Sequence, residues 1–132
     1  MAKVGDVVSK KGQSIIETAL ILPVIVLIIT GIIDFSLIFN NYFILSNASR
    51  EGARAAATGS DDTEIYAAVK RSSLMLEESK LRVVVEPQEY LRKKGNEVSV
   101  IVEYDSNLIT PIISAIAPNP VCLKVKTVMR ME

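Results

Sequence analysis

The most marked pattern along the chain is a continuous run of apolar residues from Ile15 to Ile33. Glu17 is its only charged residue, and the run shows no polar face at helical spacing. A helix over 15–33 is about 28 Å long, close to the thickness of the hydrocarbon core of a bilayer. Because the core helix of a small domain would keep a polar side for water, the pattern predicts a membrane span.

The residues before the run, 1–12, are polar, and their basic residues Lys3, Lys10 and Lys11 outnumber the single acid Asp6. Few basic residues follow the run closely. Because the more basic flank of a span stays in the cytoplasm, the N-terminus is expected inside and the rest of the chain outside. The run begins too late, and is too long, for an ordinary secretory signal peptide, and no small-residue cleavage site follows it.

Beyond the span, the pattern from Asp34 to Thr58 becomes amphipathic and contains no proline. One face is apolar, with small residues toward its end that would let another element approach closely, and the other face is polar. One helix is therefore expected from about Ser14 to Thr58. The apolar positions are Leu37, Ile44, Leu45, Ala48, Gly52, Ala55 and Ala56, and the polar positions are Asn40, Asn47, Arg50, Arg54 and Thr58.

The residues that follow this helix change from helical to alternating patterns. The stretch from Gly59 to Thr63 is typical of a helix end followed by a new helix start, with Asp61 or Asp62 as the N-cap. A second helix is expected over about 63–77. A valine-rich stretch then predicts a strand at 81–86, and period-2 alternation predicts strands at 98–104 and 121–130. Turn residues predict a hairpin turn at 93–96, and prolines bound a loop with one helical turn at 108–117.

This order of elements predicts an α+β fold of type IV pilin-like shape. A long N-terminal helix, membrane-embedded in its first half, would pack on a small antiparallel sheet of about three strands together with a second short helix. Three parts are expected: a basic leader at 1–12, the long helix at 13–58 with its span at about 15–33, and an extracytoplasmic globular head at 59–132.

Composition narrows the function classes. The chain has no histidine, the commonest general base and metal ligand, and its formal net charge of +0 provides no field for nucleic acid. The acids around Asp61 and Glu77 fit no calcium-loop spacing, so no catalytic residues, metal or cofactor are expected. The single cysteine, Cys122, cannot close a bridge within the chain. It is expected to be a free thiol, with an intermolecular disulfide outside the cell as the alternative.

The informative motif lies where the leader meets the apolar run. The leader ends in Gly12, Gln13 follows, and Glu17 stands fifth after the glycine. Glycine lacks a Cβ, so a narrow protease cleft can require it. The other leader glycine, Gly5, has Lys10 as its fifth follower and no apolar run behind it. The motif resembles the processing signal of type IV prepilins, which implies that a prepilin peptidase cuts between Gly12 and Gln13 on the cytoplasmic side.

A wider stretch, from Gly12 to Gly59, resembles the TadE-like family of pilin-like proteins from tight-adherence (Flp) pilus systems. The matching residues read GQSIIETALILPVIVLIITGIIDF and ASREGARAAATG. The resemblance is weaker in the C-terminal half, where only the strand pattern and the final Val-Met-Arg-Met look similar. The residues that correspond to the family pattern are Glu17 and Pro23 in the span, the acid–aromatic pair Asp34-Phe35, and the helix end from Arg50 to Arg54.

Individual residues in this stretch have competing interpretations. Glu17 is either a charge that snorkels to the lipid surface, or the partner of the new α-ammonium of Gln13 on a neighbouring subunit, which would set the assembly register. We favour the second. Pro23 and Gly31 are candidate helix kinks, although spans often tolerate such residues. Asp34 is interpreted as marking the outer membrane–water boundary.

The resemblance implies a structural role as a minor pilin, a pseudopilin or the main subunit of a tight-adherence pilus. The precursor would lie in the cytoplasmic membrane, and the processed chain would reach an extracellular pilus used for surface adhesion. The implied partners are a prepilin peptidase, other pilin subunits and the pilus assembly machinery. Two other classes stay open: an uncleaved single-span protein whose outer domain binds a ligand or partner, and a secreted enzyme on a membrane stalk, which the missing histidine disfavours.

Overall fold

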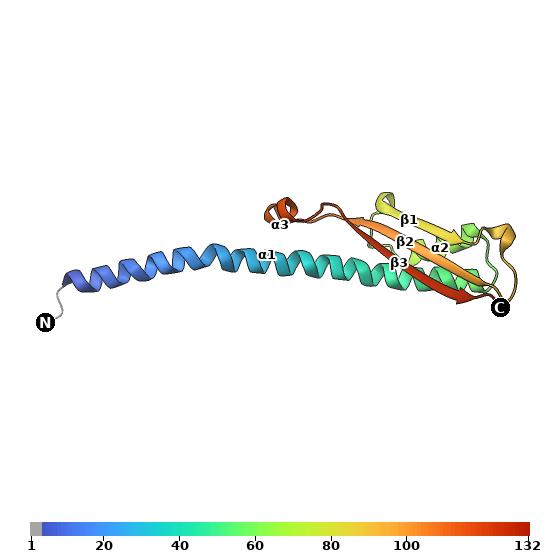
Figure 1. The fold of residues 1–132 in the computed structure, drawn as a ribbon, viewed down its shortest axis with the longest axis horizontal. Coiled ribbons are helices and arrows are strands. Elements are labelled where there is room, and N and C mark those ends of the chain that lie inside the picture. The colour runs from blue at the N-terminus through green and yellow to red at the C-terminus, as the bar shows by residue number, and fades with distance from the viewer. Residues whose placement is uncertain (1–3) are drawn as a thin grey trace.

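The computed structural model describes residues 4–132, with side chains described from Ser9 onward, so residues 1–3 of the expected leader lie outside the described part. Figure 1 shows a long helix whose C-terminal end packs into a small head, while its N-terminal half projects away. The predicted α+β fold is confirmed. The elements are α1 (Val4–Ala57), α2 (Asp62–Ser72), η1 (Glu78–Lys80), β1 (Leu81–Glu86), η2 (Glu89–Leu91), β2 (Glu97–Ser106), α3 (Pro111–Ile116) and β3 (Val121–Arg130).

Helix α1 is continuous over 54 residues and passes through both Pro23 and Gly31. It begins at Val4 rather than at about Ser14, so the described part of the leader is helical as well. The expected start was too late because this part of the leader contains no proline, and an isolated glycine costs a helix only about 1 kcal/mol relative to alanine. The other end of α1, at Ala57, agrees with the expected end near residue 58.

The junction between α1 and α2 follows the predicted stop and start. Gly59 has a φ of +87°, a left-handed conformation that glycine adopts without a Cβ penalty. The N–H of Ser60 donates to the carbonyl of Ala55 at 3.1 Å, which satisfies one of the last carbonyls of α1. Asp61 is the N-cap of α2 and accepts from the N–H of Glu64 at 2.8 Å. This confirms the expected cap.

Helix α2 ends at Ser72, earlier than the expected end at about Glu77. The Ser73 hydroxyl donates to the carbonyl of Val69 at 2.8 Å, and the Ser73 N–H donates to the carbonyl of Lys70 at 3.1 Å. Serine side chains that bond to their own backbone compete with the helical ladder. The chain therefore turns here and reaches β1 through η1.

The three strands form an antiparallel sheet in the order β1-β2-β3. The bounds of β1 and β3 agree with the predicted strands, and β2 extends slightly beyond 98–104 at both ends. The register pairs Val83 with Val102 and Val102 with Val125. This row of valines lies on the sheet face that meets the helices, as period-2 alternation requires.

The predicted hairpin turn at 93–96 is wrong as a direct link between β1 and β2, because η2 lies between the turn and β1. The turn itself exists: the N–H of Asn96 donates to the carbonyl of Lys93 at 3.1 Å, and Gly95 has a φ of +85°. It is bound to the end of β3 instead. The N–H of Gly95 donates to the carbonyl of Met131, and the N–H of Met131 donates to the carbonyl of Asn96, each at 2.9 Å.

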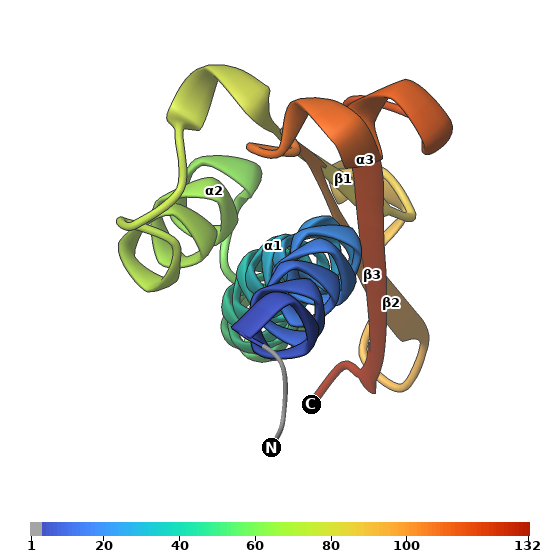
Figure 2. The same cartoon turned by 90° about the vertical axis from the view of Figure 1, so that its left-hand side faces the viewer.

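The core lies between one face of the sheet and the helices α1 and α2. Figure 2, which looks along α1, shows this helix flanked by α2 on one side and by the strands on the other. Of the apolar face predicted for α1, Leu45, Ala48, Gly52 and Ala56 are buried, whereas Leu37 is exposed. The predicted packing therefore holds for the last part of α1 and fails nearer the span.

Two small residues allow α1 to lie close to the sheet. A Cβ on Gly52 would come within 3.1 Å of Cγ1 of Val100 on β2 and within 2.6 Å of Cγ2 of Val69 on α2, so only glycine fits there without a shift. Ser49, which the amphipathic pattern did not place in the core, is fully buried. Its hydroxyl lies 2.7 Å from Oγ1 of Thr127 and 3.1 Å from the carbonyl oxygen of Val100, so its burial is compensated by hydrogen bonding.

The predicted loop at 108–117 contains the short helix α3, with Pro111 at its first position. Figure 1 shows that α3 extends from the end of the sheet toward the N-terminal half of α1, beyond the rest of the head. The segment between β2 and β3 therefore reaches the part of α1 in which the predicted span ends.

Candidate functional site: the exposed half of the long helix

The N-terminal half of α1 presents a large apolar surface. Between residues 15 and 33 the exposed fraction of the large aliphatic residues runs from 43% at Leu27 to 70% at Leu20. In the part of the chain that the structure describes, α1 is the one helix long and apolar enough to cross a membrane. A surface of this kind needs an apolar solvent or other helices to cover it.

The residues expected to take part in processing lie at the start of this surface. Among the atoms that the structure describes, none lies within 4 Å of the position that a Cβ of Gly12 would take, so packing against the described part of the chain does not require this glycine. The side-chain amide of Gln13 donates to Oε1 of Glu17 at 3.1 Å, and both residues are exposed. The structure thus brings Gln13 and Glu17 together, one helical turn apart, while their roles in processing and assembly stay predictions.

The two candidate kink residues differ in their surroundings. Pro23 has no N–H, so the carbonyl of Ala19 lacks its helical donor, although α1 continues through both residues. Gly31 is a contact point: a Cβ there would lie 3.4 Å from Cδ1 of Ile113. This is an ordinary van der Waals separation, so the α3 region comes close to α1 at Gly31. A role of Pro23 or Gly31 in bending the helix stays a prediction.

Asp34 joins α1 to the segment before α3. Its exposed fraction is 3%, and its carboxylate accepts from the N–H of Ile109 at 3.1 Å and from the N–H of Thr110 at 3.2 Å. A hydrogen bond from the Thr110 side chain, aided by the two backbone N–H groups and opposed by burial, lowers the pKa of Asp34 below its ordinary value. These hydrogen bonds from Ile109 and Thr110 therefore stabilise the carboxylate form of Asp34.

Sequence reasoning placed Asp34 at the end of the span but missed this contact. The two partners lie 75 and 76 positions away, and no local pattern links an acid in a helix to a distant loop. The available signal was the pair Thr110-Pro111, which marked the loop as the start of a helical turn. The proposed boundary position of Asp34, immediately after the apolar run, stays a prediction.

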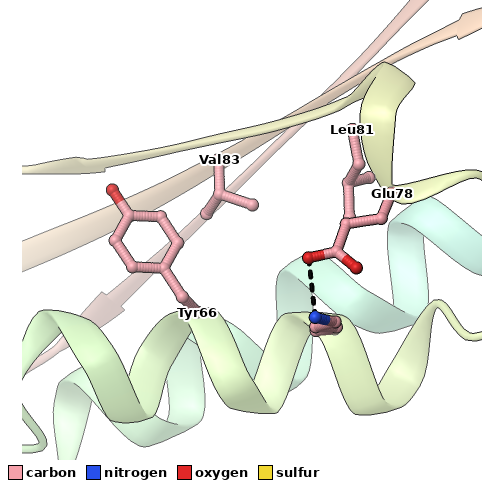
Figure 3. A pocket seen from close by; sticks show the side chains of 5 residues that line it. Tyr66, Glu78, Leu81 and Val83 are labelled. Atoms are coloured by element: carbon pink, nitrogen blue, oxygen red, sulfur yellow. Dashed lines mark ion pairs between the residues drawn. The ribbon is translucent and has the colours of Figure 1, made fainter.

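The head has a hollow of about 270 Å³ between α2 and β1, shown in Figure 3. Its lining consists of Tyr66, Lys70, Glu78, Leu81 and Val83. Nζ of Lys70 and Oε1 of Glu78 are 2.6 Å apart, so the two charges neutralise each other. With no nucleophile and base paired in this lining, the hollow gives no support to the enzyme alternative.

The acids of the head take part in structural contacts. Asp61 caps α2, and Asp62 pairs with the guanidinium group of Arg92. Within residues 9–132, whose side chains are described, no group of three or more His, Cys, Asp or Glu residues is arranged to hold a metal ion. Cys122 is an exposed free thiol on β3.

Comparison with known proteins gives one match. Residues 12–54 match the family model of the TadE-like protein, beginning at Gly12 and covering both the exposed part of α1 and most of its buried part. No curated protein and no solved structure matches the chain. The family match indicates a structural, pilin-like protein associated with a tight-adherence pilus, and the apolar helix indicates association with a membrane. Residues 12–54 therefore match the model of the TadE-like family, the family that the sequence resembles.

Proposed function

We propose that this chain is a non-enzymatic pilin-like subunit of a tight-adherence pilus. A prepilin peptidase cuts it between Gly12 and Gln13, residues 15–33 hold it in the membrane, and the assembly machinery packs it helix against helix with other pilin subunits. One observation carries the proposal. A single helix, within the stretch that matches TadE-like proteins, has one half covered by its own head and one half left apolar and uncovered.

The uncovered half is suited to two successive environments. In a bilayer, lipid tails are as apolar as leucine, so the span is stable without any protein partner. When the subunit leaves the bilayer, the same side chains must be buried against other helices, because water cannot solvate them favourably. A helix with exposed aliphatic residues and a small folded head meets both requirements.

Glu17 gives the assembly step an electrostatic requirement. Near the cytoplasmic interface its carboxylate reaches water by snorkelling, but inside a bundle of apolar helices an isolated carboxylate is costly to bury. Cleavage creates an α-ammonium on Gln13, whose side chain already lies 3.1 Å from Glu17. Pairing these charges between neighbouring subunits offsets part of their desolvation. It also sets the axial register, since a subunit one turn off would bury two unpaired charges.

Processing is tested with Gly12→Leu and, as its matched control, Gly5→Leu, both in cells that carry the pilus machinery. N-terminal sequencing of membrane and surface fractions should find the parent and Gly5→Leu starting at Gln13. Gly12→Leu should remain full-length in the membrane, because the bulky side chain blocks the protease cleft. If the parent's surface form retains Met1, the chain is an uncleaved single-span protein and the proposal is wrong.

The register role is tested with Glu17→Gln against the neighbouring substitution Thr18→Ala. The Thr18 hydroxyl bonds to the Ser14 carbonyl of its own helix, so its loss should leave assembly unchanged. Glu17→Gln should be cleaved normally and reach the parent's level in the membrane. It should be strongly depleted from sheared filaments, because leaving one buried charge unpaired costs about 3–5 kcal/mol. Equal incorporation of the two variants would refute the pairing.

A further inference from the structure

The segment between β2 and β3, residues 107–120, makes contacts that the pilin role does not explain. We call it the α3 segment. It touches α1 at two places: Ile113 lies against Gly31, and Ile109 and Thr110 donate their N–H groups to Asp34. Gly31 lies inside the predicted span, and Asp34 is the first residue after it. The α3 segment is therefore fixed at the level where the span leaves the membrane.

The surface of this segment is uncharged and largely apolar, with Asn107 and Asn119 as its exposed polar residues. No charged residue occurs between Asp105 and Lys124. Three of its isoleucines are exposed, with exposed fractions of 71% at Ile109, 48% at Ile112 and 82% at Ile116. Exposed isoleucines grouped in one short segment are unusual for a surface in contact with water.

The outer face of the sheet differs from this segment. Arg82 on β1 lies 3.3 Å from Glu103 and 3.1 Å from Asp105 on β2, and Lys124 on β3 lies 3.2 Å from the other oxygen of Glu103. Such ion pairs across three strands are typical of a solvated surface. The head thus has a charged sheet face and an apolar end, and the apolar end is the one next to the span (Figure 1).

The neighbouring surface of α1 continues the apolar end of the head. Ile32, Ile33 and Phe35, on either side of Asp34, are all exposed. If the span lies in a bilayer, these side chains meet the outer leaflet, and the α3 segment meets the same lipids. Lipid could not hydrogen-bond the backbone N–H groups of this segment. Asp34 accepts hydrogen bonds from two of them, those of Ile109 and Thr110, and the next residue, Pro111, has no N–H group.

We infer that the α3 segment is a second membrane contact of this protein, which inserts Ile109, Ile112 and Ile116 into the outer headgroup–acyl boundary of a phospholipid bilayer. Interfacial segments of this kind lie about 5–10 Å into that boundary. The contact, tied to α1 through Asp34 and Gly31, fixes the orientation of the head over the membrane. The inference rests on the membrane placement of α1, and it depends on neither cleavage nor filament assembly.

The experiment uses the full, uncut chain in phosphatidylcholine nanodiscs that hold one copy each. Cys122→Ser removes the single cysteine, and a polarity-sensitive fluorophore is attached to a new thiol, either in Ile116→Cys or in Tyr90→Cys. Both side chains are highly exposed, so neither substitution disturbs the core. Tyr90 lies in η2, at the end of the head away from the span, and is the matched control. Some discs contain lipids with a nitroxide near the start of the acyl chain.

We expect the fluorophore at position 116 to emit at shorter wavelength than the one at position 90 and to be quenched several-fold more by the nitroxide lipid. Equal emission and equal weak quenching at the two positions would overturn the inference. Emission at shorter wavelength from position 116 without quenching by the nitroxide lipid would also overturn the inference, because the segment would then be covered by protein. Since the discs contain no peptidase and no second subunit, neither result depends on whether the chain assembles into a pilus.

Discussion

Both halves of α1 have an apolar surface, but one half leaves this surface exposed and the other buries it in the head. The half that includes Leu20 and Leu27 carries large aliphatic side chains and leaves them uncovered. The half that includes Ala48, Gly52 and Ala56 carries small residues and buries them completely under the sheet and α2. One continuous helix therefore carries a surface for lipid or other helices in one half and a surface for the protein's own sheet and α2 in the other.

The difference follows from how lipid tails and a folded sheet each pack against the side chains of a helix. Lipid tails are fluid and adapt to any side chain, so bulky aliphatic residues there gain contact without needing a matched partner. A folded sheet is rigid and packed to crystal-like density, so each buried side chain of the helix, small like Ala48 or large like Leu45, must fit a matching space. Mutations of equal chemistry should therefore have unequal effects in the two halves.

The largest expected effect is that of Leu45→Ala, because Leu45 is fully buried in the core. Loss of its side chain should lower the free energy of unfolding of the head by about 3 kcal/mol. The same change at Leu20 should alter it by less than about 0.5 kcal/mol. Urea unfolding of the full chain in detergent, monitored by hydrogen exchange of the β2 amides, measures the change in the free energy of unfolding for both variants. Similar losses for the two variants would contradict the division of α1.

A smaller effect is expected for Gly52→Val. The new Cβ would meet Val69 on α2 at 2.6 Å and Val100 on β2 at 3.1 Å, so α1, α2 or the sheet must shift at a cost of about 2 kcal/mol. Gly12→Val is the control on the same helix, since nothing lies near that position. Thermal unfolding monitored by near-ultraviolet circular dichroism should show a lower midpoint for the first variant alone. An unchanged midpoint for Gly52→Val would mean that helix and sheet are not closely packed.

The smallest and most local effect is expected at Asp34, between the two halves. Its pKa lies below the ordinary value of 3.8, so its contact with the α3 segment is complete above that pH and is lost as the pH falls through the lowered pKa. Protection of the Ile109 and Thr110 amides against hydrogen exchange should fall in that acid range, with β2 unaffected. In Asp34→Asn the protection should be weaker at neutral pH and independent of acid. Acid-independent protection in the parent would show that the carboxylate does not hold the segment.

The fold could be predicted from the sequence wherever local periodicity decides the structure. The helix over the apolar run, the valine-rich strand at 81–86, the alternating strand at 121–130 and the cap Asp61 depend on neighbouring residues, and the structure agrees with each. The turn at 93–96 could not be placed correctly, because its partner is Met131 rather than the adjacent strand. The predicted end of α2 was too late, because the hydrogen bond from the Ser73 hydroxyl to the backbone ends the helix although the sequence pattern continues.

The candidate site shows the same limit. The residues that resemble the TadE-like family, including Gly12, Glu17 and Pro23, lie in one continuous stretch of sequence. They could therefore be recognised from the sequence alone, and the family match over 12–54 agrees with that resemblance. The contact of Asp34 with Thr110 is long-range and was not foreseen. Glu17, whose proposed role depends on another subunit, shows an exposed side chain and a neighbour on its own helix. Its role can be decided by assembly experiments alone.

The bond between Ser49 and Thr127 has a consequence for how the protein is made. The two residues are 78 positions apart, so the core cannot close until β3 has been synthesised. Under the proposed topology, the ribosome has by then delivered residues 15–33 to the bilayer, and the head must cross it as an unfolded chain. Long-range strand pairing is intrinsically slow, but a pre-formed, anchored helix gives the late strands a fixed surface on which to assemble. Under that topology, the helix is in the bilayer before β3 is available to complete the core.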